Sequence, residues 1–150
     1  MTPLTKIPPP VALVGSIIGA VLLTRAIPAL QVVCFRVPLA AAGVALAAGA
    51  WSGWAMIEFR RFRTTILPQH QPTRLLCAGP FCVSRNPLYL AMLLLAATPW
   101  LWWGSLGLLL APLGFFSFSN WIIIPFEEAK LRGLFGDAYA DYARRVRRWL

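Results

Sequence analysis

Four long apolar runs decide what kind of fold this chain can adopt. A membrane-spanning helix needs about 20 mostly apolar residues to cross about 30 Å of hydrocarbon, and each run has roughly that length. A basic, polar segment separates the second run from the third, and a polar tail follows the fourth. We therefore expect an all-α integral membrane protein with transmembrane helices over approximately residues 11–30, 37–58, 87–103 and 105–126.

The expected domain organisation is a single membrane domain over residues 1–150, with an N-terminal helical hairpin in residues 1–60. Small residues on the second helix predict a face for close helix packing, and Pro112 predicts a kink in the fourth helix. The tail after residue 126 repeats apolar side chains at helical spacing beside several arginines, which suits an amphipathic helix on the membrane surface. The small residues are Gly43, Ala47, Gly49, Ala50 and Gly53.

The composition agrees with a membrane protein, because 59% of the residues are hydrophobic and only 13% are charged. Soluble domains carry about 25% charged residues. In a soluble protein the net charge of +9 would suggest a nucleic-acid partner, but here it fits basic residues that face anionic lipid. We expect contacts with membrane lipids and none with nucleic acid. The spacing of the three cysteines predicts no metal site, and His70 receives no role.

The distribution of lysine and arginine predicts the orientation. Lys6, the basic segment 60–85 and the tail 130–148 fall on one side of the expected helices, whereas only Arg25 and Arg36 fall on the other. We therefore expect a multi-pass protein of the cytoplasmic membrane, with both termini and the basic segments in the cytosol. The first apolar run is interpreted as a retained helix and not as a signal peptide.

Polar residues stand directly before the third helix, in the stretch GPFCVSRNPLYLAMLLL (residues 79–95). Asn86 suits the N-cap and Pro87 the first helical position, while the free N–H groups of a helix start favour an anionic group. Glu127 and Glu128 end the fourth helix at the same depth, and Glu127 can accept hydrogen bonds from hydroxyls or an ammonium. Together the two helix ends predict a clamp for a zwitterionic or polyhydroxylated cofactor.

The same residues can be explained without a ligand. Arg85 can be one more basic residue on the cytoplasmic side, and Asn86 with Pro87 can be only a helix cap. The two glutamates can pair with Lys130 and Arg132 and simply end the helix. No acidic residue falls at mid-membrane, which argues against a proton-coupled transporter.

The order of the motifs adds information. LLCAGPFCVSRNPLYLAMLLL, one apolar hairpin and EEAKLRGLFGDAYADYARRVRRWL resemble the C-terminal half of the isoprenylcysteine carboxyl methyltransferase family and its phospholipid methyltransferase relatives, over residues 73–149. Arg-Asn-Pro at residues 85–87 is similar to the bacterial-type members. The resemblance implies an integral-membrane methyltransferase that uses S-adenosylmethionine, releases S-adenosylhomocysteine and binds this cofactor in residues 61–150. It also implies a lipophilic small-molecule or lipid acceptor that is reached from the bilayer.

The resemblance assigns residues by position in the two motifs. It implies catalytic roles for Arg85, Asn86 and Glu127, in which Arg85 orients the acceptor or the cofactor carboxylate and Glu127 anchors the cofactor. Tyr139 and Tyr142 would close the site. Ile123 stands where the isoprenylcysteine enzymes carry an arginine, so a prenylcysteine acceptor is not expected. The implied cofactor-binding residues are Thr73, Arg74, Leu75, Leu76, Phe81, Asn86, Pro87, Leu88, Tyr89 and Glu127.

Two alternative functions stay open at this point. Membrane reductases of the sterol-reductase type share a similar C-terminal pattern and bind a nicotinamide cofactor, although they need further cations for a 2′-phosphate. A small four-helix carrier or accessory protein is the non-enzymatic alternative. It would need a polar group inside the membrane, for which Ser117, Ser119 and Asn120 are the nearest candidates.

Overall fold

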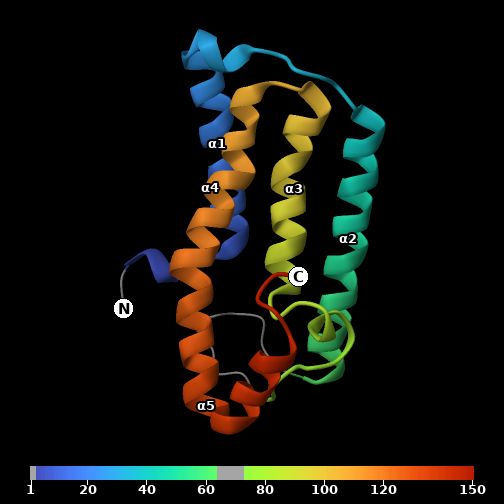
Figure 1. The fold of residues 1–150 in the computed structure, drawn as a ribbon, viewed down its shortest axis with the longest axis vertical. Helices are drawn as coiled ribbons and strands as arrows, with labels where there is room; N and C mark the ends of the chain where they lie inside the picture. Colours follow the sequence, from blue (N-terminus) through green and yellow to red (C-terminus); the bar gives the residue numbers. More distant parts are fainter. Residues whose placement is uncertain (1–2, 64–72) are drawn as a thin grey trace.

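The computed structural model describes residues 3–63 and 73–150, which form helical columns that stand side by side (Figure 1). The columns are α1 (Pro9–Ala26), α2 (Pro38–Arg61), α3 (Pro87–Trp103) and a long fourth column that contains α4 (Leu110–Phe118) and α5 (Ile124–Arg145). Short 3₁₀ turns cover Pro3–Lys6, Pro28–Gln31, Gly79–Cys82 and Leu106–Leu109. The described residues contain no strand, and the predicted all-α fold class is confirmed.

The helix boundaries follow local sequence signals. Pro87 occupies the first position of α3, where a missing N–H costs nothing, and Gly104 ends the helix in the left-handed conformation (φ 72°). The predicted range of this helix is therefore confirmed. In α1, Pro9 and Pro10 stand in the first turn, but the helix ends at Ala26, and residues 28–31 form a 3₁₀ turn instead of the expected last turn.

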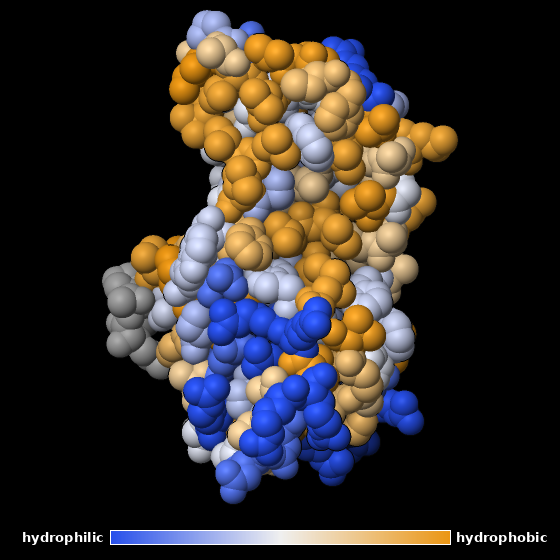
Figure 2. Space-filling view, viewed as in Figure 1, coloured by the Kyte–Doolittle hydropathy of each residue, from blue (hydrophilic) through white to orange (hydrophobic). Residues whose placement is uncertain are grey.

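Three of the helical segments are long and apolar enough to cross a membrane: Pro9–Ala26, Pro38–Arg61 and the helical stretch Leu106–Arg145. The α3 helix is a shorter apolar helix. Large apolar side chains such as Leu39 and Leu46 point outward from α2. Figure 2 shows hydrophobic side chains over the upper part of the molecule and hydrophilic ones gathered over the lower part. The chain is an integral membrane protein.

The α2 helix packs along α3, and α1 packs along α4. The α2 face that packs inward carries Ala41, Ala48 and Ala55, which are fully buried and recur every seven residues. Such a spacing keeps small side chains on one seam, so two backbones can approach closely. The predicted small-residue face was wrong, because Gly43, Ala47, Gly49, Ala50 and Gly53 are exposed on another side of α2.

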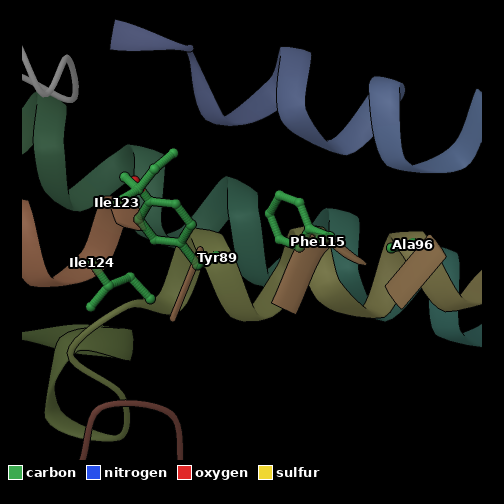
Figure 3. Packing of buried hydrophobic residues seen from close by; sticks show 5 residues of the cluster. All are labelled: Tyr89, Ala96, Phe115, Ile123 and Ile124. Carbon is green, nitrogen blue, oxygen red and sulfur yellow. The ribbon is translucent and has the colours of Figure 1, made fainter. Parts of the chain in front are cut away.

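The main core lies between α3 and the fourth column, where Tyr89, Ala96, Phe115, Ile123 and Ile124 are buried together (Figure 3). A smaller cluster of Ala55, Leu76 and Phe81 joins α2 to the 3₁₀ turn Gly79–Cys82. The two clusters fix the lower end of α3 between α2 and α5, which is where the candidate site is built.

The fourth column differs from the two separate helices that the sequence predicts. It runs from Leu106 to Gly136, where the chain turns back, and a π turn over Ser119–Ile123 joins α4 to α5. Pro125, two residues after the π turn, has no N–H to give to a carbonyl of that turn. Pro112 lies in the first turn of α4 and marks no break. The break comes at Gly136 (φ 49°, ψ −123°).

Beyond Gly136 the chain turns back, and its end lies beside the lower end of α3 (Figure 1). We call residues 137–150 the C-terminal arm. Tyr139 and Tyr142 of the arm are buried against the rest of the protein, and the ring of Trp149 packs on Phe116 at 5.2 Å. Tyr139, Tyr142 and Trp149 therefore face the protein, whereas Leu150 is exposed, and a position of the tail on the membrane surface stays a prediction. The predicted loop between α2 and α3 falls partly outside the described residues, including His70.

Candidate functional site

The start of α3 is held by the C-terminal arm. Asn86 occupies the N-cap position as predicted, but its side chain makes no capping hydrogen bond. Its Nδ2 instead donates to the carbonyl oxygen of Arg148 at 3.0 Å. Ser84 Oγ accepts from the backbone N–H of Asn86 at 3.1 Å and donates to the same Arg148 carbonyl at 3.4 Å. The amide of Asn86 is thus engaged by the arm.

Glu128 is the centre of a charged cluster. Arg148 donates to both of its carboxylate oxygens, from Nε at 3.1 Å and from Nη2 at 2.7 Å, and this interaction raises the pKa of Arg148. Arg85 Nη1 lies 3.3 Å from Glu128 Oε1. Two guanidinium groups therefore share one buried carboxylate, so the cluster carries a surplus positive charge. Glu128 therefore pairs with Arg85 and Arg148, whereas Lys130 interacts electrostatically with Glu127, in part as the ligand-free explanation expects.

Glu127 has a different environment from Glu128. Its Oε1 accepts a hydrogen bond of 2.7 Å from the hydroxyl of Tyr89, whose ring is part of the core between α3 and α5 (Figure 3). Lys130, three residues further along α5, interacts electrostatically with Glu127. The Tyr89 hydroxyl orients the carboxylate, whose oxygens can accept several hydrogen bonds.

The two tyrosines of the arm lie on the start of α3. The hydroxyl of Tyr142 donates to the carbonyl oxygen of Phe81 at 2.7 Å. The hydroxyl of Tyr139 accepts from Arg85 Nη1 at 3.4 Å. Arg85 Nε is buried and has no hydrogen-bond partner. A buried N–H without a partner is costly, so it is a natural position for an acceptor that a ligand would provide.

The remaining residues that the resemblance assigns divide into two groups. Leu76 and Phe81 are buried, and the ring of Phe81 meets that of Phe59 edge to face at 5.5 Å. Thr73 and Arg74 are exposed, at the edge of the residues that the structure describes. The structure brings Arg85, Asn86, Tyr89 and Glu127 to one end of the bundle, whereas their predicted roles stay predictions. Leu75 and Leu88 are half-buried, and Pro87 is buried.

The sequence missed Arg148 and the part that Asn120 plays. Asn120 was a candidate for a transport pathway, but its Oδ1 accepts from Trp149 Nε1 at 3.1 Å and from Arg148 Nη1 at 3.4 Å. Arg148 is one of several arginines in the tail, and no local signal distinguishes it from its neighbours. Among the described residues, no three His, Cys, Asp or Glu side chains gather as a metal site.

The sequence was also compared with known protein families. A family model described as phospholipid methyltransferase matches residues 35–138. The chain belongs to the phospholipid methyltransferase family. No curated protein and no solved structure matches it. The match starts before α2 and ends before Tyr139, so it reaches further toward the N-terminus than the resemblance over residues 73–149. Family membership supports a membrane methyltransferase over the reductase and carrier alternatives.

Proposed function

We propose that the protein transfers a methyl group from S-adenosylmethionine to a lipophilic acceptor that arrives from the bilayer. The observation that carries the proposal is the buried Nε of Arg85, which has no hydrogen-bond partner. The same end of the bundle holds the carboxylate of Glu127, which the Tyr89 hydroxyl orients. Arg85 contacts Glu128, the sequence neighbour of Glu127, so the guanidinium and the Glu127 carboxylate belong to one region.

The residues present fit the amino-acid part of this cofactor. That part carries an ammonium and a carboxylate, and a carboxylate acceptor and a guanidinium donor are the groups that bind them. Leu76 and Phe81 offer an apolar surface beside the polar groups. Glu127 would hold the ammonium and Arg85 the carboxylate, which sharpens the roles that the resemblance implies for both residues.

The chemistry demands little beyond binding and orientation. The cofactor supplies a methyl group on a sulfonium, which is already electrophilic, so no covalent nucleophile on the protein is required. The chain's own residues have to align the acceptor and exclude water. Arg85 and Tyr89 orient the polar groups, and the C-terminal arm covers the start of α3 from the water side.

A lipophilic acceptor agrees with the apolar surroundings of the site. Ile123, at the position of the arginine in the isoprenylcysteine enzymes, is 1% exposed and belongs to the core. A prenylcysteine carboxylate would meet no cation there, so we propose a different acceptor. We further propose that the site faces the cytosol, because the exposed arginines gather at this end of the molecule (Figure 2).

Calorimetric titration of the detergent-solubilised protein with S-adenosylhomocysteine tests the proposal. We expect binding, and we expect Glu127→Gln to weaken it by roughly tenfold or more, because the charge that holds the ammonium is lost. Asp137→Asn is the matched control, because it removes one exposed carboxylate from α5 and should leave affinity unchanged. No binding to the unchanged protein at millimolar ligand would refute the cofactor assignment.

The acceptor class is tested by the product. Protein incubated with methyl-labelled S-adenosylmethionine and bilayer lipid extract should yield label in the organic phase, and Glu127→Gln should abolish most of it. Label that stays in water-soluble products would contradict a lipophilic acceptor. Stabilisation of the protein by nicotinamide dinucleotides, but not by S-adenosylhomocysteine, would favour the reductase alternative.

A further inference from the structure

Gly136 gives the C-terminal arm a hinge. Its backbone (φ 49°, ψ −123°) interrupts an otherwise continuous helix and turns the chain back. A Cβ at this position would meet nothing within 4 Å, so the conformation and not the available space calls for glycine. Gly133 lies three residues earlier in regular helix and also has open space around it. The single departure from helical geometry in α5 therefore falls where the arm begins.

Arg148 fastens the other end of the arm. Its guanidinium binds both oxygens of Glu128, which lies before the hinge, at 3.1 and 2.7 Å. Trp149 adds a second anchor through its Nε1 to Asn120 Oδ1 at 3.1 Å. Paired hydrogen bonds between a guanidinium and a carboxylate are directional and strong. Arg147, in contrast, exposes its side chain, and only its carbonyl oxygen takes part, as the acceptor for Arg85 N–H at 3.0 Å.

Between the hinge and this fastening, the arm covers residues that the resemblance assigns to the cofactor. It contacts the Phe81 carbonyl through Tyr142 and the Asn86 amide through the Arg148 carbonyl. Phe81 and Asn86 are each only 8% exposed, and both are in contact with the arm. Movement of the arm would release both polar groups.

We propose that the C-terminal arm is a lid on the candidate site, hinged at Gly136 and latched by Arg148 on Glu128. The lid opens to admit the cofactor and closes to hold it and to exclude water. The access role rests on the proposed function, whereas the hinge and the latch rest on the contacts of the arm alone. The arm residues 139–150 lie beyond the range that the family model matches.

Hydrogen–deuterium exchange, read by mass spectrometry on arm peptides, tests the latch in the ligand-free protein. We expect Arg148→Gln to speed exchange in residues 137–150 by about tenfold, since a two-pronged charged pair is lost. Exchange in α2 should not change. Arg147→Gln is the matched control and should leave the arm as it is. Arg148→Lys should restore part of the protection. Equal exchange in Arg148→Gln and Arg147→Gln would overturn the latch.

The hinge is tested in the same way. Gly136→Ala forces a side chain into a left-handed conformation, so the closed arm becomes strained and should exchange faster by roughly fivefold. Gly133→Ala has neither strain nor a new contact and should not speed exchange. If both substitutions leave exchange of the arm unchanged, Gly136 is not a hinge that the closed state depends on.

The lid role is tested with S-adenosylhomocysteine. Bound ligand should slow exchange in the arm, and Arg148→Gln should speed both association and dissociation of the ligand by about tenfold, because the arm is open more often with and without ligand. A merely structural role would alter exchange throughout the protein without this parallel change in the two rates. Ligand that binds without slowing exchange in the arm would overturn the lid. Failure of the unchanged protein to bind would refute the proposed function instead, and the ligand-free measurements would still decide the hinge and the latch.

Discussion

At the upper end of the bundle in Figure 1, backbone hydrogen bonds and the hydroxyl of Ser105 join the connections, whereas at the lower end charged side chains add to the backbone bond of Arg85 with Arg147. The upper contacts include Cys34 N–H to the Gly104 carbonyl and Leu106 N–H to the Val32 carbonyl, both at 2.9 Å. The lower contacts centre on Glu128, Arg85 and Arg148. The upper end therefore depends on how closely backbones approach, and the lower end on charge.

This difference in bonding indicates that the lower end, and not the upper end, can open and close. Backbone hydrogen bonds in a neutral, largely apolar setting persist across salt concentration, and their exchange for water is costly. Ion pairs that are partly open to water can form and separate at lower cost. A rigid upper end can hold the helices in place while the arm at the lower end moves.

The largest expected effect belongs to Gly104→Ala at the upper end. Gly104 has φ 72°, and a Cβ there would lie 1.4 Å from the Phe35 carbonyl oxygen. The backbones of two connections would have to separate, so we expect a loss of about 3 kcal/mol or more in the free energy of unfolding. Unfolding in detergent, followed by circular dichroism, measures it. Gly43→Ala, which meets no neighbour within 4 Å, is the control, and an equal effect there would contradict the close approach.

The next effect belongs to Glu128→Ala at the lower end. Two guanidinium groups lose their shared carboxylate, and we expect a loss of about 2 kcal/mol, less than for a fully buried pair because Arg148 is partly exposed. The loss should shrink in high salt, because screening weakens the ion pairs of the unchanged protein, whereas that of Gly104→Ala should not. Unfolding at low and high salt would show it. An equal response to salt in both variants would show that charge does not distinguish the lower end from the upper end.

Tyr142→Phe should cost less, about 1 kcal/mol. The ring keeps its packing, but the Phe81 carbonyl loses the 2.7 Å hydrogen bond from the hydroxyl. Tyr139→Phe is the comparison within the arm, because its hydroxyl meets Arg85 at a longer 3.4 Å and should matter less. Thermal unfolding of both variants ranks them. A larger effect at Tyr139 would show that the charged cluster, and not the carbonyl contact, fixes the arm.

The smallest effect is expected for Asp141→Asn. Asp141 pairs with Arg144 on the outer side of the arm, where both side chains are more than half exposed. Exposed pairs contribute little, so we expect a change below about 0.5 kcal/mol in the free energy of unfolding and no change in arm exchange. The same two measurements decide it. A change as large as that of Glu128→Ala would mean that charge, irrespective of burial, holds the lower end.

The sequence predicts the helices well where proline and glycine mark both ends. Pro87 and Gly104 bound α3, and its predicted range is the observed one. The end of the fourth helix was misplaced, because Glu127 and Glu128 were interpreted as the end of a membrane helix, whereas nothing there stops a helix from continuing. The actual break is at Gly136, which has a positive φ. Glycine permits this conformation, but its presence in the sequence does not show that the chain adopts it.

The sequence could predict which residues near the start of α3 and in α5 belong to the candidate site, but not their contacts with the C-terminal arm. Arg85, Asn86 and Tyr89 lie at the start of α3, and the expected end of the fourth helix placed Glu127 at the same depth, although that helix continues. The partner of Glu128 was not predictable, because Arg148 reaches it only after the chain reverses at Gly136. Asn86 shows the same limit, because a distant carbonyl replaced the local cap that its position predicts.

The π turn before Pro125 has a rotational consequence for the site. Each residue of an α-helix turns the chain by about 100°, so one additional residue in a turn rotates everything after it by that angle about the axis. The π turn therefore sets the rotation about the helix axis at which Glu127 of α5 points toward Tyr89 of α3. Removal of one residue from Ser119–Ile123 would keep the column nearly as long, but it would aim Glu127 away from Tyr89.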